Sequence, residues 1–76
     1  MQLGKSGVTD SFLRELKTRL EKHGIVKVRA LKSFRQKHTD DIYAVAGLLA
    51  EQTNSRIYDI RGFTIILIKD KELKDV

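Results

Sequence analysis

The sequence predicts a two-layer α/β sandwich with the element order β-α-β-α-β-β and a mixed four-stranded sheet. Two segments carry apolar residues at helical spacing, and stretches with the composition of strands lie before and after them. The last two such stretches are separated only by a short turn signal, which is typical of a hairpin. The chain has 76 residues, 41% of them hydrophobic, which suits one domain with one thin core.

A short strand is expected at residues 1–3, and the first helix is expected from Thr9 to about His23. The Thr9 hydroxyl can cap the first turn, and Gly24 is a typical residue just after a helix end. The apolar residues of this helix recur at helical spacing and are Phe12, Leu13, Leu16 and Leu20.

The second strand is expected over Ile25–Leu31, because apolar and charged residues alternate along it. One face would carry Val26, Val28 and Ala30, and the other face would carry Lys27 and Arg29. The segment Lys32–His38 that follows is strongly basic and lacks apolar periodicity, so it is expected to be a loop.

The first two strands are joined through a helix, and such a connection places the two strands parallel to each other.

The second helix is expected to begin after Thr39-Asp40-Asp41 and to end near Thr53-Asn54. Its apolar residues, Ile42, Val45, Ala46 and Leu49, have the spacing of an amphipathic helix.

The last two strands are expected over Arg56–Ile60 and Phe63–Lys69, with the turn at Arg61-Gly62. The final strand is nearly continuous in apolar residues, which is typical of an inner strand covered on both faces. The single domain would therefore span residues 1–70, and residues 71–76 would form a charged tail.

Basic residues are concentrated in the first half of the chain. The net charge is +5, from 15 basic and 10 acidic residues, but residues 1–37 hold ten basic and three acidic ones. Such clustering favours binding to a polyanion, because each phosphate that Lys or Arg neutralises releases condensed counterions. A basic surface that only keeps the protein solvated is the alternative interpretation.

Several classes of protein are disfavoured by what the sequence lacks. It has no cysteine, which excludes disulfides and thiolate zinc sites and fits a reducing, cytoplasmic compartment. No apolar run is long enough to span a membrane, and the first residues do not resemble a signal peptide. His23 and His38 lie outside any metal-binding motif and are expected on the surface. We expect no enzyme activity, no cofactor and no metal.

The most informative short motif is Gly4-Lys5-Ser6-Gly7, between the first strand and the first helix. Glycines let the backbone approach a phosphate closely, Lys5 supplies charge, and the loop amides and helix start supply hydrogen bonds and a positive dipole end. The GxxG loop of KH domains holds nucleic-acid backbone with comparable geometry. A tight turn that needs glycine dihedral angles is the alternative, and the motif is not a Walker loop.

The basic segment Lys32–His38 is the second candidate site. The ring of Phe34, flanked by cations, could stack on an unpaired base, or it could pack against the domain and anchor a solvated loop. Lys27 and Arg29 would add charge if the sheet face opposite the helices is open. The candidate residues outside the glycine loop are Lys27, Arg29, Lys32, Phe34, Arg35 and Lys37.

In their order along the chain, these features resemble the CRM domain, the YhbY-like RNA-binding family. The resemblance covers about residues 2–69 and rests on Gly-Lys-Ser-Gly-Val-Thr before a helix, the strand Ile25-Val26-Lys27-Val28, and the turn at Gly62 into Thr64-Ile65-Ile66-Leu67. It implies a fold similar to the C-terminal domain of bacterial translation initiation factor three. It also implies RNA binding in the maturation of ribosome precursors or in group II intron splicing in plant organelles. By position, the family's glycine loop falls on Gly4–Gly7 and its basic strand on Lys27 and Arg29.

The sequence departs from the family pattern at two places. Members usually carry a helix before the glycine loop, so a first strand that begins this chain is expected to be less protected. The family often has a basic residue just after the hairpin glycine, whereas here Phe63 follows Gly62 and the cation, Arg61, precedes it. The sequence therefore gives no support for an RNA contact at that turn.

The leading hypothesis is a non-catalytic, monomeric RNA-binding protein that holds the phosphate backbone of structured RNA, either ribosomal RNA or ribosome precursors. The glycine loop and the basic first half would make these contacts. Two alternatives stay open: a ribosome-associated adaptor whose basic surface meets an acidic protein, and a double-stranded DNA-binding protein.

Overall fold

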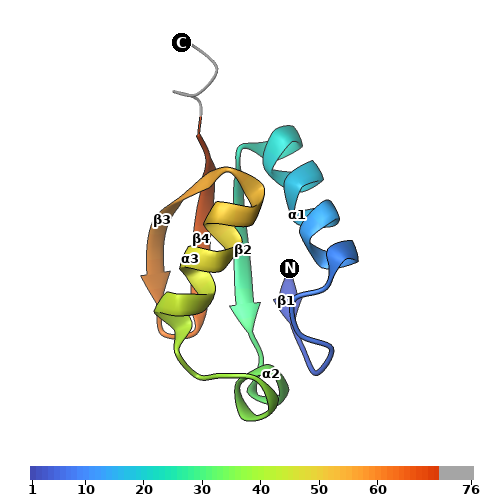
Figure 1. Cartoon of the computed structure of the whole chain (residues 1–76). Coiled ribbons are helices and arrows are strands. Elements are labelled where there is room, and N and C mark those ends of the chain that lie inside the picture. The colour runs from blue at the N-terminus through green and yellow to red at the C-terminus, as the bar shows by residue number, and fades with distance from the viewer. Residues whose placement is uncertain (71–76) are drawn as a thin grey trace.

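The computed structural model describes residues 1–70 and confirms the predicted fold class, with one helix more than expected. Along the chain the elements are β1 (Gln2–Leu3), α1 (Asp10–His23), β2 (Ile25–Ala30), α2 (Lys32–Lys37), α3 (Ile42–Thr53), β3 (Ser55–Arg61) and β4 (Thr64–Lys69) (Figure 1). The charged tail expected over residues 71–76 lies outside the described residues.

Within residues 1–70, four strands form one mixed sheet in the order β1-β2-β4-β3. β1 is parallel to β2, and β4 is antiparallel to both β2 and β3. The last strand is therefore an inner strand, as its apolar run predicts, but the described helices cover only one of its faces and not both as expected. β1 has only two residues, but Leu3 is fully buried and the Met1 amino group donates to the Lys27 carbonyl at 2.9 Å. The first strand is thus better protected than the sequence led us to expect.

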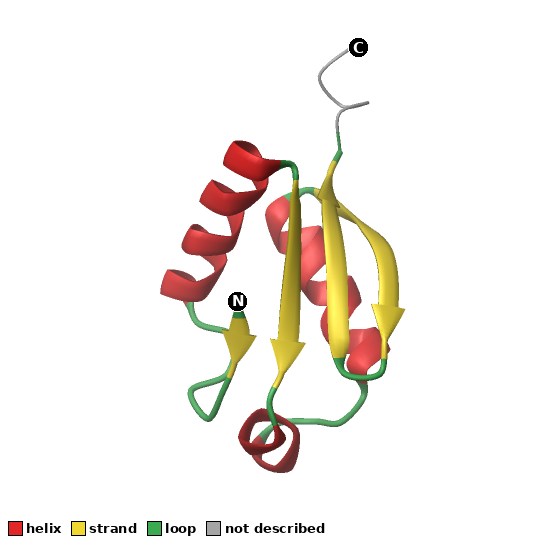
Figure 2. Ribbon diagram, turned by 180° about the vertical axis from the view of Figure 1, so that it is seen from behind, coloured by secondary structure: helices red, strands yellow, loops and turns green. Residues whose placement is uncertain are grey.

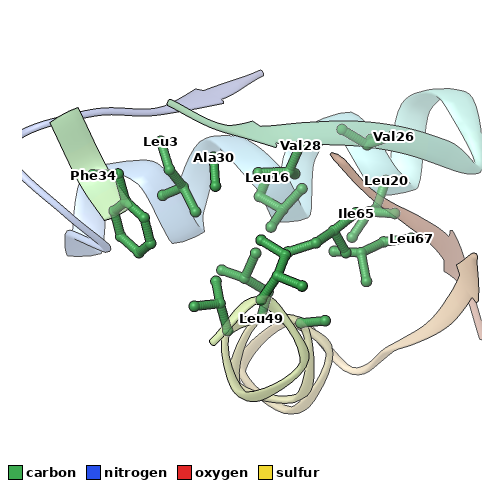
Figure 3. Close-up of a cluster of buried hydrophobic side chains, with 13 residues drawn as sticks. Leu3, Leu16, Leu20, Val26, Val28, Ala30, Phe34, Leu49, Ile65 and Leu67 are labelled. Carbon is green, nitrogen blue, oxygen red and sulfur yellow. The ribbon is translucent and has the colours of Figure 1, made fainter. Parts of the chain in front are cut away.

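The helices α1 and α3 cover one face of the sheet, which gives the two layers (Figures 1 and 2). Side chains alternate along a strand, so every second residue of β2 and β4 points toward these helices. Figure 3 shows the resulting core, in which β2 contributes Val26, Val28 and Ala30, β4 contributes Ile65 and Leu67, and the helices contribute Leu16, Leu20 and Leu49. The alternate residues of both strands point to the opposite face of the sheet, where Lys27 and Arg29 are exposed.

The predicted ends of the two long helices are confirmed, because the capping residues make the expected contacts. The Thr9 hydroxyl accepts a hydrogen bond from the Phe12 N–H at 3.1 Å, and Gly24 ends α1 with a φ of 80°. The Asp41 carboxylate accepts from the Ala44 N–H at 3.2 Å and begins α3. Each such N-terminal cap stabilises a helix by about 1 kcal/mol.

The prediction of a loop over Lys32–His38 is wrong, because residues Lys32–Lys37 form the helix α2. Six residues make fewer than two helical turns, and among them only one apolar residue is buried. That residue is Phe34, and a single residue cannot show a periodicity. Lysine, arginine and glutamine favour helix, and burial of the Phe34 ring against the domain supplies the remaining stabilisation.

The final hairpin is confirmed with shifted boundaries. β3 extends through Arg61, so the turn consists of Gly62 and Phe63, and Gly62 has a φ of 58° that favours glycine. The register of β3 against β4 shifts between Ile57 and Asp59, which inserts Tyr58 as an extra residue in β3.

Truncation of Leu67 tests the position of β4 at the centre of the sheet. Leu67 is fully buried, so Leu67→Ala leaves a cavity and is expected to lower the free energy of unfolding by about 2–5 kcal/mol, measured by urea denaturation. Tyr43→Ala is the control, because that side chain is 72% exposed and its loss should change stability by roughly 0.5 kcal/mol or less. Equal effects of the two substitutions would contradict this placement of β4.

Candidate nucleic-acid interface

The glycine loop is a closed turn that presents its two central residues to solvent. The Gly7 N–H donates to the Gly4 carbonyl at 3.0 Å, and Gly7 has a φ of 75°, where other residues are strained. Lys5 and Ser6 are exposed at the tip, whereas Gly7 is buried. Because the Gly7 N–H is used within the turn, ligand contacts of this loop would come from the Lys5 side chain and the backbone near Lys5 and Ser6.

His38 joins the glycine loop to α2. Its Nε2 lies 2.9 Å from the Lys5 carbonyl oxygen, and since a carbonyl only accepts, Nε2 carries the hydrogen and donates. A Cβ at Gly7 would lie 2.8 Å from the same nitrogen, too close for any side chain to fit without a shift. Gly7 is therefore required by its dihedral angles and by the imidazole packed against it. Sequence reasoning placed His38 on the surface, which is correct, but had no signal for this contact.

Phe34 lies on the inner side of α2, and the hypothesis that its ring stacks on a base does not fit its position. The side chain is 3% exposed and belongs to the hydrophobic core. Its ring centroid lies 5.2 Å from that of His38, so the ring supports the same histidine that holds the glycine loop. Of the two interpretations of Phe34 left open by the sequence, the structure supports the packing role.

Cations of α2 lie beside the glycine loop. The loop, α2 and the β3–β4 turn occur along one edge of the molecule, the lower end of Figures 1 and 2. We call this surface, made of residues 4–7, 32–38 and 62–63, the basic edge. Its exposed lysines are Lys5, Lys32 and Lys37. The start of α2 also packs near the loop, since a Cβ at Gly4 would lie 3.9 Å from the Ser33 hydroxyl oxygen.

Arg35 differs from the lysines of α2, because its guanidinium is held in place. The Cζ atom lies 3.7 Å from the centroid of the Phe63 ring, and Nε donates to the Ala30 carbonyl at 3.3 Å. The contact places a cation over the β3–β4 turn, where the sequence alone gave no support for an RNA contact.

Lys27 and Arg29 lie on the open face of the sheet, as the alternation of β2 predicts. Arg29 is the last but one residue of β2 and ends beside the basic edge. Lys27 lies two residues further back, which is roughly 7 Å along a strand. Arg29 is therefore close to the cations of α2, whereas Lys27 is set apart from them on the sheet.

The open face also carries arginines of β3 that sequence reasoning did not select. Arg56 and Arg61 lie in the second half of the chain, where acidic residues outnumber basic ones, so charge clustering does not indicate them. In strict alternation they would point to opposite faces. The register shift in β3 places both on the open face, opposite Ile68 and Thr64 of β4.

Asp59 partly neutralises this group of cations. Its carboxylate accepts a hydrogen bond from Arg61 Nε at 2.9 Å and another from the Ile60 N–H at 2.8 Å. The Arg61 side chain, followed by that backbone N–H, lowers the pKa of Asp59. A lowered pKa means that the ion pair favours the folded chain above the ordinary pKa of the carboxyl, and this contribution is lost as the pH falls below that value. Arg61 is therefore already paired at neutral pH.

Two other kinds of feature were not found in residues 1–70. No three His, Cys, Asp or Glu side chains in this range are arranged to hold a metal ion. None of the helices described here is long and apolar enough to cross a membrane.

Comparison with known proteins gives a match over nearly the whole chain. Residues 1–69 match the family model of the CRS1 / YhbY (CRM) domain. The chain is 32% identical over 76 residues to the Bacillus subtilis (strain 168) protein named "Probable RNA-binding protein YqeI", with 99% of this chain and 75% of that protein covered.

A solved structure has the same fold. The chain is similar to the solution structure of the hypothetical protein SAV1595 from Staphylococcus aureus, which is proposed to bind RNA, with a TM-score of 0.71 and 28% identity. The similarity covers 91% of this chain and 68% of that one. The family match includes the glycine loop, α2 and the β3–β4 turn. The chain belongs to the CRS1/YhbY (CRM) domain family, as the resemblance in its sequence predicts.

Proposed function

We propose that this chain is a non-catalytic RNA-binding protein that holds the phosphate backbone of structured RNA on its basic edge. The observation that carries the proposal is the contact of His38 with the glycine loop, which fixes Lys5 beside the cations of α2. The names of the two similar proteins, both of which refer to RNA binding, support this class of ligand.

Phosphate contacts are expected to dominate this interface. The exposed groups of the basic edge are mainly lysines and backbone, which neutralise phosphates and carry little base-specific information. Burial of Phe34 in the core removes that ring as a surface for stacking bases, which also favours backbone contacts over base contacts. Recognition would then depend on the shape of a folded RNA more than on its sequence.

The family resemblance narrows the proposal further. We propose that the RNA is ribosomal RNA or part of a ribosome precursor, and that the protein acts in the cytoplasm as a monomer. Crosslinking in cells, followed by sequencing of the attached RNA, tests this identification. Recovery of mainly ribosomal sequences is expected, and recovery of messenger RNA without them would contradict it.

Charge reversal at the tip of the glycine loop tests the main contact. Lys5→Glu is expected to raise the dissociation constant for a fluorescein-labelled RNA hairpin by about tenfold or more, because a phosphate then faces a carboxylate. Anisotropy titrations at several salt concentrations give the measurement. The slope of log K against log salt should fall in magnitude by about 0.7–0.9 for each phosphate that the protein no longer neutralises.

The matched control is Lys22→Glu, which changes the net charge equally in the last turn of α1. It should weaken binding much less than Lys5→Glu, and equal effects would show that only the total charge matters. A flat salt dependence of the unaltered protein would contradict phosphate binding. If duplex DNA competes for the protein as effectively as RNA does, the chain would be a DNA-binding protein. If RNA binds weakly while an acidic protein co-purifies with the chain, the chain would be an adaptor.

Substitution of His38 tests whether the position of the loop matters. His38→Ala removes the hydrogen bond to the Lys5 carbonyl and should weaken RNA binding by about fivefold. His38→Gln is expected to retain most of the affinity, since its amide can donate to the same carbonyl. The same anisotropy titration measures both variants. Unchanged affinity of His38→Ala in a protein that melts at the normal temperature would contradict the role assigned to this histidine.

A further inference from the structure

A hollow of about 520 Å³ lies between the end of β2, the start of α2 and the β3–β4 turn. Three cations line it, Arg29, Lys32 and Arg35, together with the ring of Phe63. Among the described residues that line it there is no carboxylate. Three positive charges that converge without an acid between them repel one another, and an anion bound among them would relieve this repulsion.

Arg35 is held in a fixed position at this hollow. Its guanidinium lies over the Phe63 ring at 3.7 Å, and the hydrogen bond from Nε to the Ala30 carbonyl fixes the direction of the side chain. Guanidinium donors form a planar fork that matches the oxygens of a phosphate. Because Nε is used by the backbone, the two Nη groups are the donors that suit a ligand. Less side-chain freedom is lost on binding when the fork is held beforehand.

The exposure of Phe63 fits a positioning role. A large apolar ring at 43% exposure contributes little to the core, and Phe63 is not part of the buried cluster. Its position after Gly62 places the ring below the Arg35 guanidinium. The Phe63 carbonyl also accepts from the Ala30 N–H at 2.8 Å, which ties the turn to the end of β2. The Phe63 ring and the Ala30 carbonyl, which together orient Arg35, are therefore held in position relative to each other.

We propose that this hollow is a second phosphate-binding site, in which Arg35 binds one phosphodiester group of the RNA between Arg29 and Lys32, with Phe63 as the positioning residue. The inference rests on the RNA-binding function proposed above. A phosphate is favoured over a base because three cations converge here and the Phe63 ring already covers one face of the guanidinium. The glycine loop and the β3–β4 turn, which borders this hollow, lie on either side of α2 in Figure 2, so one RNA would contact the protein at two separate phosphates.

Four variants test the site with a fluorescein-labelled RNA hairpin in anisotropy titrations over a range of potassium chloride concentrations. Arg35→Gln removes the charge, Arg35→Lys keeps the charge without the planar fork, and Phe63→Leu keeps an apolar side chain without the aromatic face. The double variant Arg35→Gln/Phe63→Leu shows whether Phe63 acts through Arg35. Lys22→Gln is the control, because it removes one charge from the far end of α1.

Arg35→Gln is expected to raise the dissociation constant about tenfold and to reduce the magnitude of the salt slope by about 0.7–0.9. Arg35→Lys should also weaken binding while the slope stays nearly unchanged. Phe63→Leu should raise the dissociation constant about threefold, the size of an exposed cation–π contact. The double variant should bind no more weakly than Arg35→Gln, because Phe63 has no role once Arg35 is absent.

Arg35→Gln binding no more weakly than Lys22→Gln would overturn the site. Additive losses in the double variant would overturn the positioning role of Phe63. Either result can be told apart from failure of the proposed function. That function would fail if the unaltered protein did not bind the hairpin, or if Lys5→Glu had no effect on binding. Thermal melting of each variant, monitored by circular dichroism, separates loss of binding from loss of fold.

Discussion

The packing of His38 against the glycine loop is the contact on which the candidate interface depends. It joins the Lys5 carbonyl to a residue 33 positions later in the chain, and it fills the space beside Gly7 that a side chain would need. His38 is held in turn by the ring of Phe34, which is anchored in the core. Core packing thereby fixes the position of an exposed, charged loop. A rigid loop loses less conformational freedom when it binds a ligand than a free one does.

The fold separates the charges of this chain from its core. Because α1 and α3 cover one face of the sheet, apolar residues of β2 point inward while Lys27 and Arg29 point to the open face. The register shift in β3 adds Arg56 and Arg61 to that face, although Asp59 pairs with one of them. Cations therefore occur on the open face as well as on the basic edge, and their combined field would also speed the approach of a polyanion.

The sequence predicts those features that depend on local contacts. Thr9 and Gly24 mark the ends of α1 because capping is made within a few residues. The apolar run of β4 predicts its inner position in the sheet, although the described helices cover only one of its two faces. The helix α2 was missed because it buries only Phe34. The role of His38 and the contact of Arg35 with Phe63 depend on residues far apart in sequence. No spacing or composition signals such contacts.

Chemical-shift mapping tests the central claim most directly, because it reports which residues a bound RNA touches without altering any of them. Uniformly ¹⁵N-labelled protein would be titrated with an unlabelled RNA hairpin, and amide shifts would be followed residue by residue. The largest changes are expected at residues 4–7, 32–38 and 62–64, with smaller ones on the open face of the sheet. Changes concentrated on the exposed side of α3, near Tyr43 and Leu48, with the basic edge unaffected, would contradict this account.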